Sequence, residues 1–523
     1  MLTLLILLPI LGALALALTP KESAKLQRLV TLAATGATAL LGGILWFSFD
    51  GALSEAQFAV KLPWFEVPGA HAATQVNYQL GVDGLSILLV ALTAFLMPLV
   101  VLSTFGHIKT RVREFCIWLL IMQAGMFGVF LSADLVLFYF FWEVSLVPLY
   151  FMLGIWGSDR RLYATLKFFL YTLAGSLVML IAAIYLIYQH GSSDIAVLTE
   201  TMRAEPLAGQ TWLFLGFALA FAIKVPMLPF HTWLADAHTE APTAGSVILA
   251  GVLLKMGTYG LLRFGIAMFP QAALTFAPWF MGLGAIGIVY GAFLAMAQAD
   301  LKRLIACSSV SHLGYVVMGL FAMTQAGLRG SILQMINHGL STGLLFLLVG
   351  MIYERRHTRM LDQFGGLAKV MPIFAVFLGL AVFSSVGLPG LNGFVGEYLI
   401  LLGTFEASPF WACIGVTGVI FGAVYMLSAT RRVLLGEIKV KENEGLKDLD
   451  TREIGLMIPI AVLILFIGVS PSTFMDKMDG SIDSLVLDLD DARTSLALHE
   501  TLEQPGHTAA ADQAHQLKVE TTR

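Results

Sequence analysis

Four ionisable side chains occur inside long apolar stretches of the chain, where a charge has few polar neighbours. Glu143 lies in Phe-Phe-Trp-Glu-Val-Ser, Lys255 lies in Gly-Val-Leu-Leu-Lys-Met-Gly, and Lys224 directly precedes Val-Pro-Met-Leu-Pro. Glu397 follows a Gly-Leu-Pro-Gly segment that interrupts a fourth stretch. If these stretches cross a membrane, each charge costs about 3 kcal/mol on insertion scales, and such residues usually have a function. We therefore expect the four side chains to carry ions.

Carboxylates, lysines and histidines placed along one path can transfer protons. A lysine removed from water loses much of its preference for the charged form, and a nearby carboxylate restores it. A pair of variable separation, such as Glu143 and Lys224, would therefore vary the proton affinity of the lysine. His231, His312 and His338 could link the path, because histidine titrates nearer to neutral pH than other side chains. We expect His231 on the helical face of Lys224, seven residues further on.

A structural role is the alternative for all of these residues. The charges could form static ion pairs, and each histidine could be a satisfied buried residue. The spread of the charges over four expected helices, in both halves of the chain, favours a path instead. Lys167 is a weaker candidate because its side chain could reach the inner surface. Asp134 and Asp300 stand at expected helix starts, where a capping role is simpler.

No cofactor or metal motif has the context that it requires. The residues Gly282–Gly287 match the GxGxxG pattern of dinucleotide-binding loops, but no strand precedes them and they lie inside an expected spanning helix. Close helix packing explains these glycines better. His231 and His238 have no further ligand cluster, which makes a metal site improbable. The three cysteines are scattered without a CxxC pair, so neither an iron–sulfur cluster nor a zinc site is expected.

The composition places these side chains in a membrane. Of 523 residues, 58% are hydrophobic and 13% are charged, whereas soluble domains carry about 25% charged residues. The net charge of −4 argues against nucleic acid as a partner. Spanning helices need about 20 mostly apolar residues. We expect about 14 of them, near 2–19, 28–48, 82–103, 115–131, 134–156, 163–188, 211–231, 244–267, 276–297, 301–322, 330–353, 370–404, 409–430 and 454–470.

Two of the expected helices are broken, and the basic residues indicate an orientation. Pro226 and Pro229 interrupt the seventh span, and the residues Gly387–Gly390 interrupt the twelfth. Lysine and arginine concentrate in alternate loops, which places those loops inside and both termini outside. The apolar residues 2–18 have no basic segment before them, so we interpret them as a retained span. The polar tail from about residue 480 is expected to be a short amphipathic or disordered external segment.

The chain contains an internal repeat. Ala-Asp-Leu recurs at 133 and 299, with Val-Ser at the same distance beyond each, and Leu228-Pro229 matches Leu388-Pro389 at nearly the same offset. Five spans separate the matched elements, so the two five-helix repeats would be inverted, as in many transporters. The expected organisation is an N-terminal unit of three helices (1–110), a first repeat (111–270), a second, inverted repeat (271–432), an inner loop with the last helix (433–475) and a polar tail (476–523).

The run from Lys224 to Gly257, with its Lys-Val-Pro-Met-Leu-Pro and Leu-Leu-Lys-Met-Gly ends, closely resembles the hallmark of the antiporter-like subunits of respiratory complex I. Span number and repeat fit that family up to about residue 475. Glu397 stands where most branches carry lysine, which favours the M-type branch, as does the missing lateral helix. The chain departs from the family at Ala235, where proline is frequent.

The resemblance implies a role for each candidate residue. Glu143 would pair with Lys224 and tune it, Lys255 would pass protons across the middle, and Glu397 would connect to the outer exit. The family's membrane-arm subunits hold no NADH, flavin, iron–sulfur cluster or quinone of their own, so none is expected here. The implied partners are other complex I membrane subunits, above all neighbouring antiporter-like ones, together with the lipid bilayer of the energy-conserving inner (cytoplasmic) membrane and protons.

We therefore expect an all-α polytopic membrane protein that acts as a non-redox, proton-translocating subunit of an NADH:quinone oxidoreductase. The first alternative is an Mrp-type cation/proton antiporter subunit, which would work without a redox partner. The second is a scaffold whose buried charges only fix the packing of helices.

Overall fold

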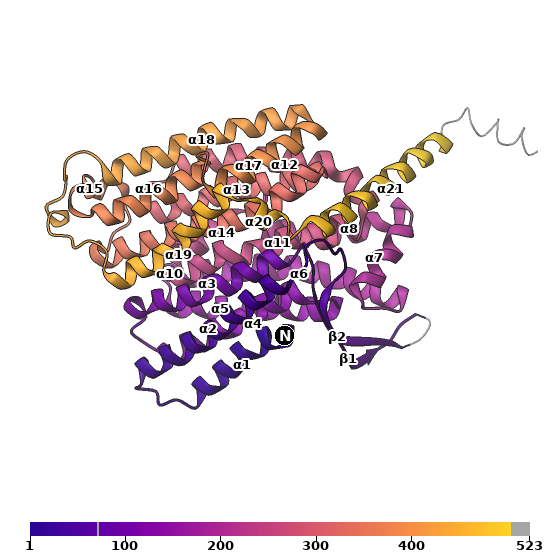
Figure 1. The fold of residues 1–523 in the computed structure, drawn as a ribbon, viewed down its shortest axis with the longest axis horizontal. Helices are drawn as coiled ribbons and strands as arrows, with labels where there is room; N and C mark the ends of the chain where they lie inside the picture. The colour runs from indigo at the N-terminus through magenta and orange to yellow at the C-terminus, as the bar shows by residue number, and fades with distance from the viewer. Residues whose placement is uncertain (71–72, 504–523) are drawn as a thin grey trace, which may run out of the picture.

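The computed structural model describes residues 1–70 and 73–503, which form a bundle of mostly parallel and antiparallel helices (Figure 1). The first part of the chain forms α1 (Leu2–Ala17), α2 (Ala24–Ser48), β1 (Gln57–Val67), β2 (Thr74–Val82), α3 (Ile87–His107), α4 (Val112–Leu131), α5 (Leu135–Trp156), α6 (Arg161–His190) and α7 (Ile195–Ala204).

The middle of the chain supplies the helices at the centre of the bundle. They are α8 (Leu207–Lys224), α9 (Thr232–Glu240), α10 (Thr243–Ile248), the π-helical η1 (Leu249–Leu253), α11 (Leu254–Gly260), the π-helical η2 (Leu261–Ile266), α12 (Pro270–Met296), α13 (Leu301–Ala322) and α14 (Gln325–Arg356). The last part forms η3 (Leu361–Gln363), α15 (Leu367–Val370), α16 (Pro372–Val386), α17 (Asn392–Ala407), α18 (Pro409–Leu434), η4 (Lys441–Asn443), α19 (Thr451–Val469), α20 (Ser472–Met475) and α21 (Asp479–Glu503).

The protein is a polytopic helical membrane protein. Within the described residues, 12 helical segments are long and apolar enough to cross a membrane. The apolar helices α1 and α16 are shorter than the other spans. The helix expected over 370–404 is divided into α16 and α17, because Gly387 and Gly390 adopt positive φ angles of 79° and 89° between them. The helix expected over 211–231 ends as α8 at Lys224, and α9 begins only at Thr232.

A β-hairpin that the sequence did not lead us to expect lies at one end of the bundle, which we call the hairpin end (Figure 1). Its strands β1 and β2 pair antiparallel, and Ala133 before α5 donates its backbone N–H to Gln79 of β2 at 2.9 Å. The opposite end, which carries α15 and the loop at 435–450, is called the loop end. The hairpin thus marks the end at which α5 begins.

The starts of α5 and α13 share one backbone arrangement at opposite ends of the bundle. Asp134 caps α5 and Asp300 caps α13, and each carboxylate accepts two backbone N–H bonds, which confirms the capping roles expected from the sequence. Each start also pairs with a later segment through two backbone hydrogen bonds of 2.8–3.0 Å: Leu135 with Ser193 and Ile195 with Ala133 in one case, Leu301 with Arg359 and Leu361 with Ala299 in the other.

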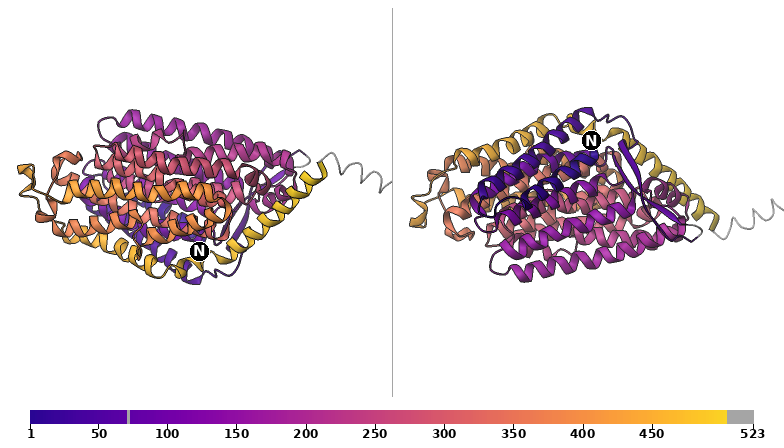
Figure 2. Two further views of the ribbon diagram at one scale, coloured as in Figure 1. Left: turned by 90° about the horizontal axis from the view of Figure 1, so that it is seen from above. Right: turned by 90° about the horizontal axis from the view of Figure 1, so that it is seen from below.

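The polar C-terminal segment is a helix through Glu503, rather than a short or disordered one. Helix α21 runs obliquely across the hairpin end (Figure 2). Arg203 of α7 lies 2.6 Å from Asp488, and Arg329 of α14 lies 2.9 Å from Asp479 and 3.2 Å from Asp483, so three ion pairs attach α21 to the bundle. The remainder of the expected tail, residues 504–523, lies outside the described residues.

Candidate functional site

Lys255 occupies the centre of the bundle. It lies at the start of α11, directly after the π-helical turn η1. The spanning segment Thr243–Ile266 that contains it is buried inside the bundle. Its side chain is fully buried, with 0% exposure. The Nζ atom donates to the backbone carbonyl of Ala250 and lies 2.7 Å from Nδ1 of His338. Single π-helical turns are frequent at functional sites, and here such a turn carries the carbonyl that contacts the lysine.

Three further candidates follow Lys255. The rings of His338 and His312 lie 5.6 Å apart, centre to centre, and Nδ1 of His312 lies 3.1 Å from Oε1 of Glu397. All three side chains are buried. A cavity of about 10 Å³ lies beside the two rings, close to the smallest volume that holds one water. We call Lys255, His338, His312 and Glu397 the central series.

Neutral polar side chains surround the Glu397 end of the central series. Gln334 donates from Nε2 to Oε1 of Glu397 at 3.1 Å, and Oγ of Ser385 lies 3.1 Å from Nε2 of His312. Sequence reasoning missed both residues, because a lone amide or hydroxyl in an apolar helix gives no signal of its own. Their donors and acceptors leave the carboxylate and the imidazole with hydrogen-bonded partners on more than one side.

The break between α16 and α17 brings the backbone against Glu397. A Cβ atom added to Gly387 would lie 3.1 Å from Oε2 of Glu397, and the φ angle of 79° at this position disfavours any residue with a side chain. Asn337 of α14 donates to the backbone carbonyl of Asn392 at 2.7 Å. The broken helix therefore serves to bring the carboxylate close to unwound backbone, and side chains from α14 bind the polar groups that the break exposes.

Glu143 and Lys224 are neighbours that make no direct contact through their charged groups. Lys224 is the last residue of α8 and is 2% exposed, and its Nζ lies 5.3 Å from the ring centre of Trp142 and 5.9 Å from that of Phe168. Among the described residues, no hydrogen bond or ion pair joins Lys224 to Glu143, although Glu143 acts on it as a neighbouring opposite charge. Aromatic faces stabilise the ammonium in place of a direct contact. The pair is thus open.

His231 lies apart from Lys224. The helical face that was expected to bring the two together does not exist, because α8 ends at Lys224 and the chain turns before α9. His231 packs edge-on against Tyr290 of α12, with 5.1 Å between ring centres. Lys167, the weaker candidate, pairs with Asp236 of α9 at 2.8 Å. These two side chains therefore face the α9 region rather than the central series.

The backbone brings the two groups of charges near each other. A Cβ atom added to Gly257 of α11 would lie 3.1 Å from Cβ of Lys224 and 2.9 Å from the backbone nitrogen of Val225. The glycine thus allows the end of α8 to approach α11, two residues beyond Lys255. Among the described residues, no side-chain hydrogen bond joins Lys224 to Lys255.

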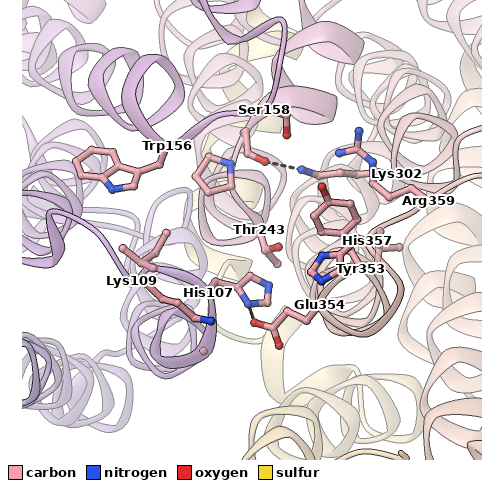
Figure 3. A pocket seen from close by; sticks show the side chains of 16 residues that line it. His107, Lys109, Trp156, Ser158, Thr243, Lys302, Tyr353, Glu354, His357 and Arg359 are labelled. Carbon is pink, nitrogen blue, oxygen red and sulfur yellow. Dashed lines mark hydrogen bonds and ion pairs between the residues drawn. The ribbon is translucent and has the colours of Figure 1, made fainter. Parts of the chain in front are cut away.

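A polar cavity of about 520 Å³ opens at the loop end (Figure 3). His107 contacts Glu354 within it, and Lys302 donates to the backbone carbonyl of Ala241. Lys302 is only 6% exposed and lies inside the first turn of α13. Sequence reasoning did not single it out, since adjacent basic residues at a span end, here Lys302 and Arg303, resemble a loop.

His238 is a second buried residue that sequence reasoning set aside after considering only metal binding. It is fully buried on α9, and its ring stacks on Phe346 of α14 at 4.8 Å between ring centres. Both Lys302 and Lys255 lie near enough to act on it electrostatically. Its place in the run 224–257 was the signal that could have identified it.

Two family models match parts of the chain. Residues 132–422 match the family described as "NADH:quinone oxidoreductase/Mrp antiporter, TM", and residues 26–128 match "NADH-ubiquinone oxidoreductase chain 4, amino terminus". The chain is 45% identical to NADH-quinone oxidoreductase subunit M of Rhodobacter capsulatus over 494 residues, which cover 92% of this chain and 95% of the relative. It is 42% identical to NADH-ubiquinone oxidoreductase chain 4 of Arabidopsis thaliana over 483 residues, covering 92% and 96%.

A solved structure gives the same result for the fold. A chain of respiratory complex I from Thermus thermophilus with bound NADH is 33% identical and superimposes with a TM-score of 0.84, covering 94% of this chain and all of that chain. The two chains therefore share the fold over nearly the whole length of this one.

Proposed function

Because this chain belongs to the NADH:quinone oxidoreductase/Mrp antiporter family, we propose that it translocates protons as a membrane-arm subunit of an NADH:quinone oxidoreductase. The observation that carries the proposal is the central series, in which a buried lysine, two buried histidines and a buried glutamate are successive neighbours. Proton transfer requires donors and acceptors within hydrogen-bond reach. Ionisable groups inside spans mark such paths.

Each charged residue has a distinct role in the proposed path. Glu143 modulates the proton affinity of Lys224 by approaching or leaving it. When the two side chains are apart, the proton affinity of Lys224 is low. Lys255 receives the proton at the centre of the bundle. His338 and His312 pass it to Glu397, from which it leaves, and His231 contributes from the α9 region.

Electron transfer takes place elsewhere in the proposed complex. The chain acts as a non-redox subunit, and NADH, flavin, iron–sulfur clusters and quinone bind to partner subunits. Energy released by their reactions reaches this chain as a movement of helices or charges, with neighbouring antiporter-like subunits as the partners. The names of the relatives support the assignment to an oxidoreductase complex.

The fold proposed for the whole chain has 14 spans and two inverted repeats of five helices, 111–270 and 271–432. Counting α1 as a span, and α16 with α17 as one broken span, gives this number. Two observations support the repeat. Asp134 and Asp300 cap α5 and α13 with the same backbone pairing at opposite ends of the bundle. Broken helices, α8 to α9 and α16 to α17, occur in corresponding positions of the two halves.

The proposed location is the energy-conserving inner (cytoplasmic) membrane. In the proposed orientation the hairpin end and both termini face the outer side, because lysine and arginine concentrate in the loops of the loop end. The cavity at Lys302 and His107 then opens to the inner side, from which protons would be taken up.

A cation/proton antiporter of the Mrp type is the second candidate, because the matched family includes such proteins. The two functions separate in one experiment with the purified complex in closed vesicles. We expect NADH oxidation to acidify the vesicle lumen, and the ratio of protons moved to NADH oxidised to fall in Lys255→Met. The matched control is Lys369→Met, at an exposed lysine of α15. Sodium-driven proton movement without NADH, unchanged by redox inhibitors, would establish the antiporter instead.

A further inference from the structure

An apolar groove of about 510 Å³ lies between α2, α3, α14, α19 and α20, on the opposite side of α14 from the central series. Its lining is apolar apart from Thr473, and includes Gly43, Trp46, Phe95 and Leu463. We propose that this groove binds one acyl chain of a zwitterionic, ethanolamine-type phospholipid, whose phosphate contacts Lys477. The proposed proton path is not required for this site.

The depth of the groove matches one leaflet of a bilayer. On α3 its lining extends from Leu88, near the hairpin end, to Leu99. At 1.5 Å per residue this is a depth of about 16 Å, and the hydrocarbon core of a bilayer is about 30 Å thick. The groove therefore reaches from one membrane surface to the middle, which is the depth of an acyl chain. A single chain of methylenes, which is narrow and flexible, fits the depth of the groove.

The mouth of the groove has the features of a headgroup site. Trp46 and Phe474 lie 5.4 Å apart between ring centres, as expected of aromatic side chains at a membrane interface. Nζ of Lys477 lies 5.7 Å from the ring centre of Trp46 and donates to the backbone carbonyl of Phe49 at 2.7 Å. An ammonium group has three donors, so two remain for a phosphate.

Acidic neighbours determine which headgroup fits. Asp476 directly precedes Lys477, and its backbone approaches Gly51, next to the exposed Asp50. Asp50 and Asp476 thus lie in the two segments that meet at Lys477, and their negative charges oppose a headgroup with a net negative charge. They suit an ethanolamine headgroup, which carries an ammonium group a short distance beyond its phosphate. Charge complementarity therefore selects ethanolamine over glycerol headgroups.

The groove also adjoins the helix that carries His338. Ile336 and Leu340 of α14 line it, while His338 between them faces Lys255. A Cβ atom added to Gly339 would lie 2.8 Å from Cδ2 of Leu92, which also lines the groove. An acyl chain in the groove therefore supplies van der Waals contacts behind the central series.

Photo-crosslinking in the intact complex tests the proposal. The purified complex is reconstituted into vesicles of phosphatidylethanolamine and phosphatidylglycerol that contain traces of phosphatidylethanolamine with a diazirine midway along one acyl chain. We expect crosslinks to Ala91, Phe95 and Leu463. In Gly43→Phe the ring should enter the groove, because no atom lies within 4 Å of an added Cβ, and these crosslinks should fall at least tenfold.

Gly36→Phe is the matched control, on the same helix but outside the groove, where an added Cβ also meets no atom within 4 Å. It should leave the crosslinks unchanged. NADH oxidation reports assembly for both variants, and Ala91→Phe replaces Gly43→Phe if the latter does not assemble. Equal labelling of the two glycine variants overturns the site. Stronger labelling by diazirine-bearing phosphatidylglycerol, or by a diazirine-bearing quinone analogue, overturns the assigned occupant.

Discussion

Replacing His338 with alanine should interrupt the proposed path at its narrowest point. Among the described residues, His338 is the only side chain hydrogen-bonded to Nζ of Lys255, with 2.7 Å between Nζ and Nδ1. The next ring, that of His312, is centred 5.6 Å further on. Hydrogen bonds that carry protons are about 2.6–3.2 Å long, so the variant leaves a gap that no remaining side chain bridges.

The magnitude follows from two opposing effects. Lys255 loses one hydrogen bond to a ring nitrogen, worth about 1.5–3 kcal/mol when one partner is charged, but it keeps the carbonyl of Ala250. The fold should therefore persist. A group that donates and accepts a proton contributes about 100-fold to 10,000-fold to a transfer rate, so we expect proton transfer through this chain to fall at least 100-fold.

The assay compares proton movement with NADH oxidation in vesicles that contain the purified complex. His190→Ala, at the end of α6 and outside the central series, is the control. The expected result is fewer protons moved per NADH oxidised in His338→Ala and no change in His190→Ala. An assembled His338→Ala complex that moves the usual number of protons per NADH would refute the reasoning.

Three further predictions concern other parts of the chain. Glu143→Gln removes the opposite charge that acts on Lys224 but leaves its aromatic contacts; assembly should persist and proton movement per NADH should fall, which vesicle assays measure. Gly387→Ala places a side chain at a positive φ, at a cost of about 1–3 kcal/mol, so the melting temperature of the complex should fall. Gly379→Ala, where an added Cβ meets no atom within 4 Å, should leave the melting temperature unchanged. Arg203→Gln removes one ion pair of α21, and hydrogen exchange in α21 should accelerate; unchanged exchange would show that the pair does not hold the helix.

The elements that sequence reasoning predicted are those with a local physical signal. Glycine and proline act on their own backbone, so the residues Gly387–Gly390 predicted the break that separates α16 from α17. A charge in an apolar stretch is equally local, and it led directly to Lys255 and Glu397. Asp134 and Asp300 were interpreted as caps from their position alone, and both cap their helices.

The missed features depend on contacts between distant segments. Gln334 and Ser385 matter because α14 and α16 meet around Glu397 and His312, and neither residue is unusual in its own helix. The relation expected between Lys224 and His231 failed because a helix end interrupts it, and the position of that end depends on packing. The hairpin was missed because β1 is largely exposed, so no buried alternating pattern marks it.

The central claim, that protons pass through Glu397, is tested most directly by infrared difference spectroscopy of the complex during NADH oxidation. We predict that the band of a protonated carboxyl group appears and decays with turnover, that Glu397→Gln abolishes it, and that Glu406→Gln, at an exposed carboxylate of the same helix, leaves it unchanged. A spectrum in which turnover produces no carboxyl band sensitive to Glu397→Gln would contradict the account.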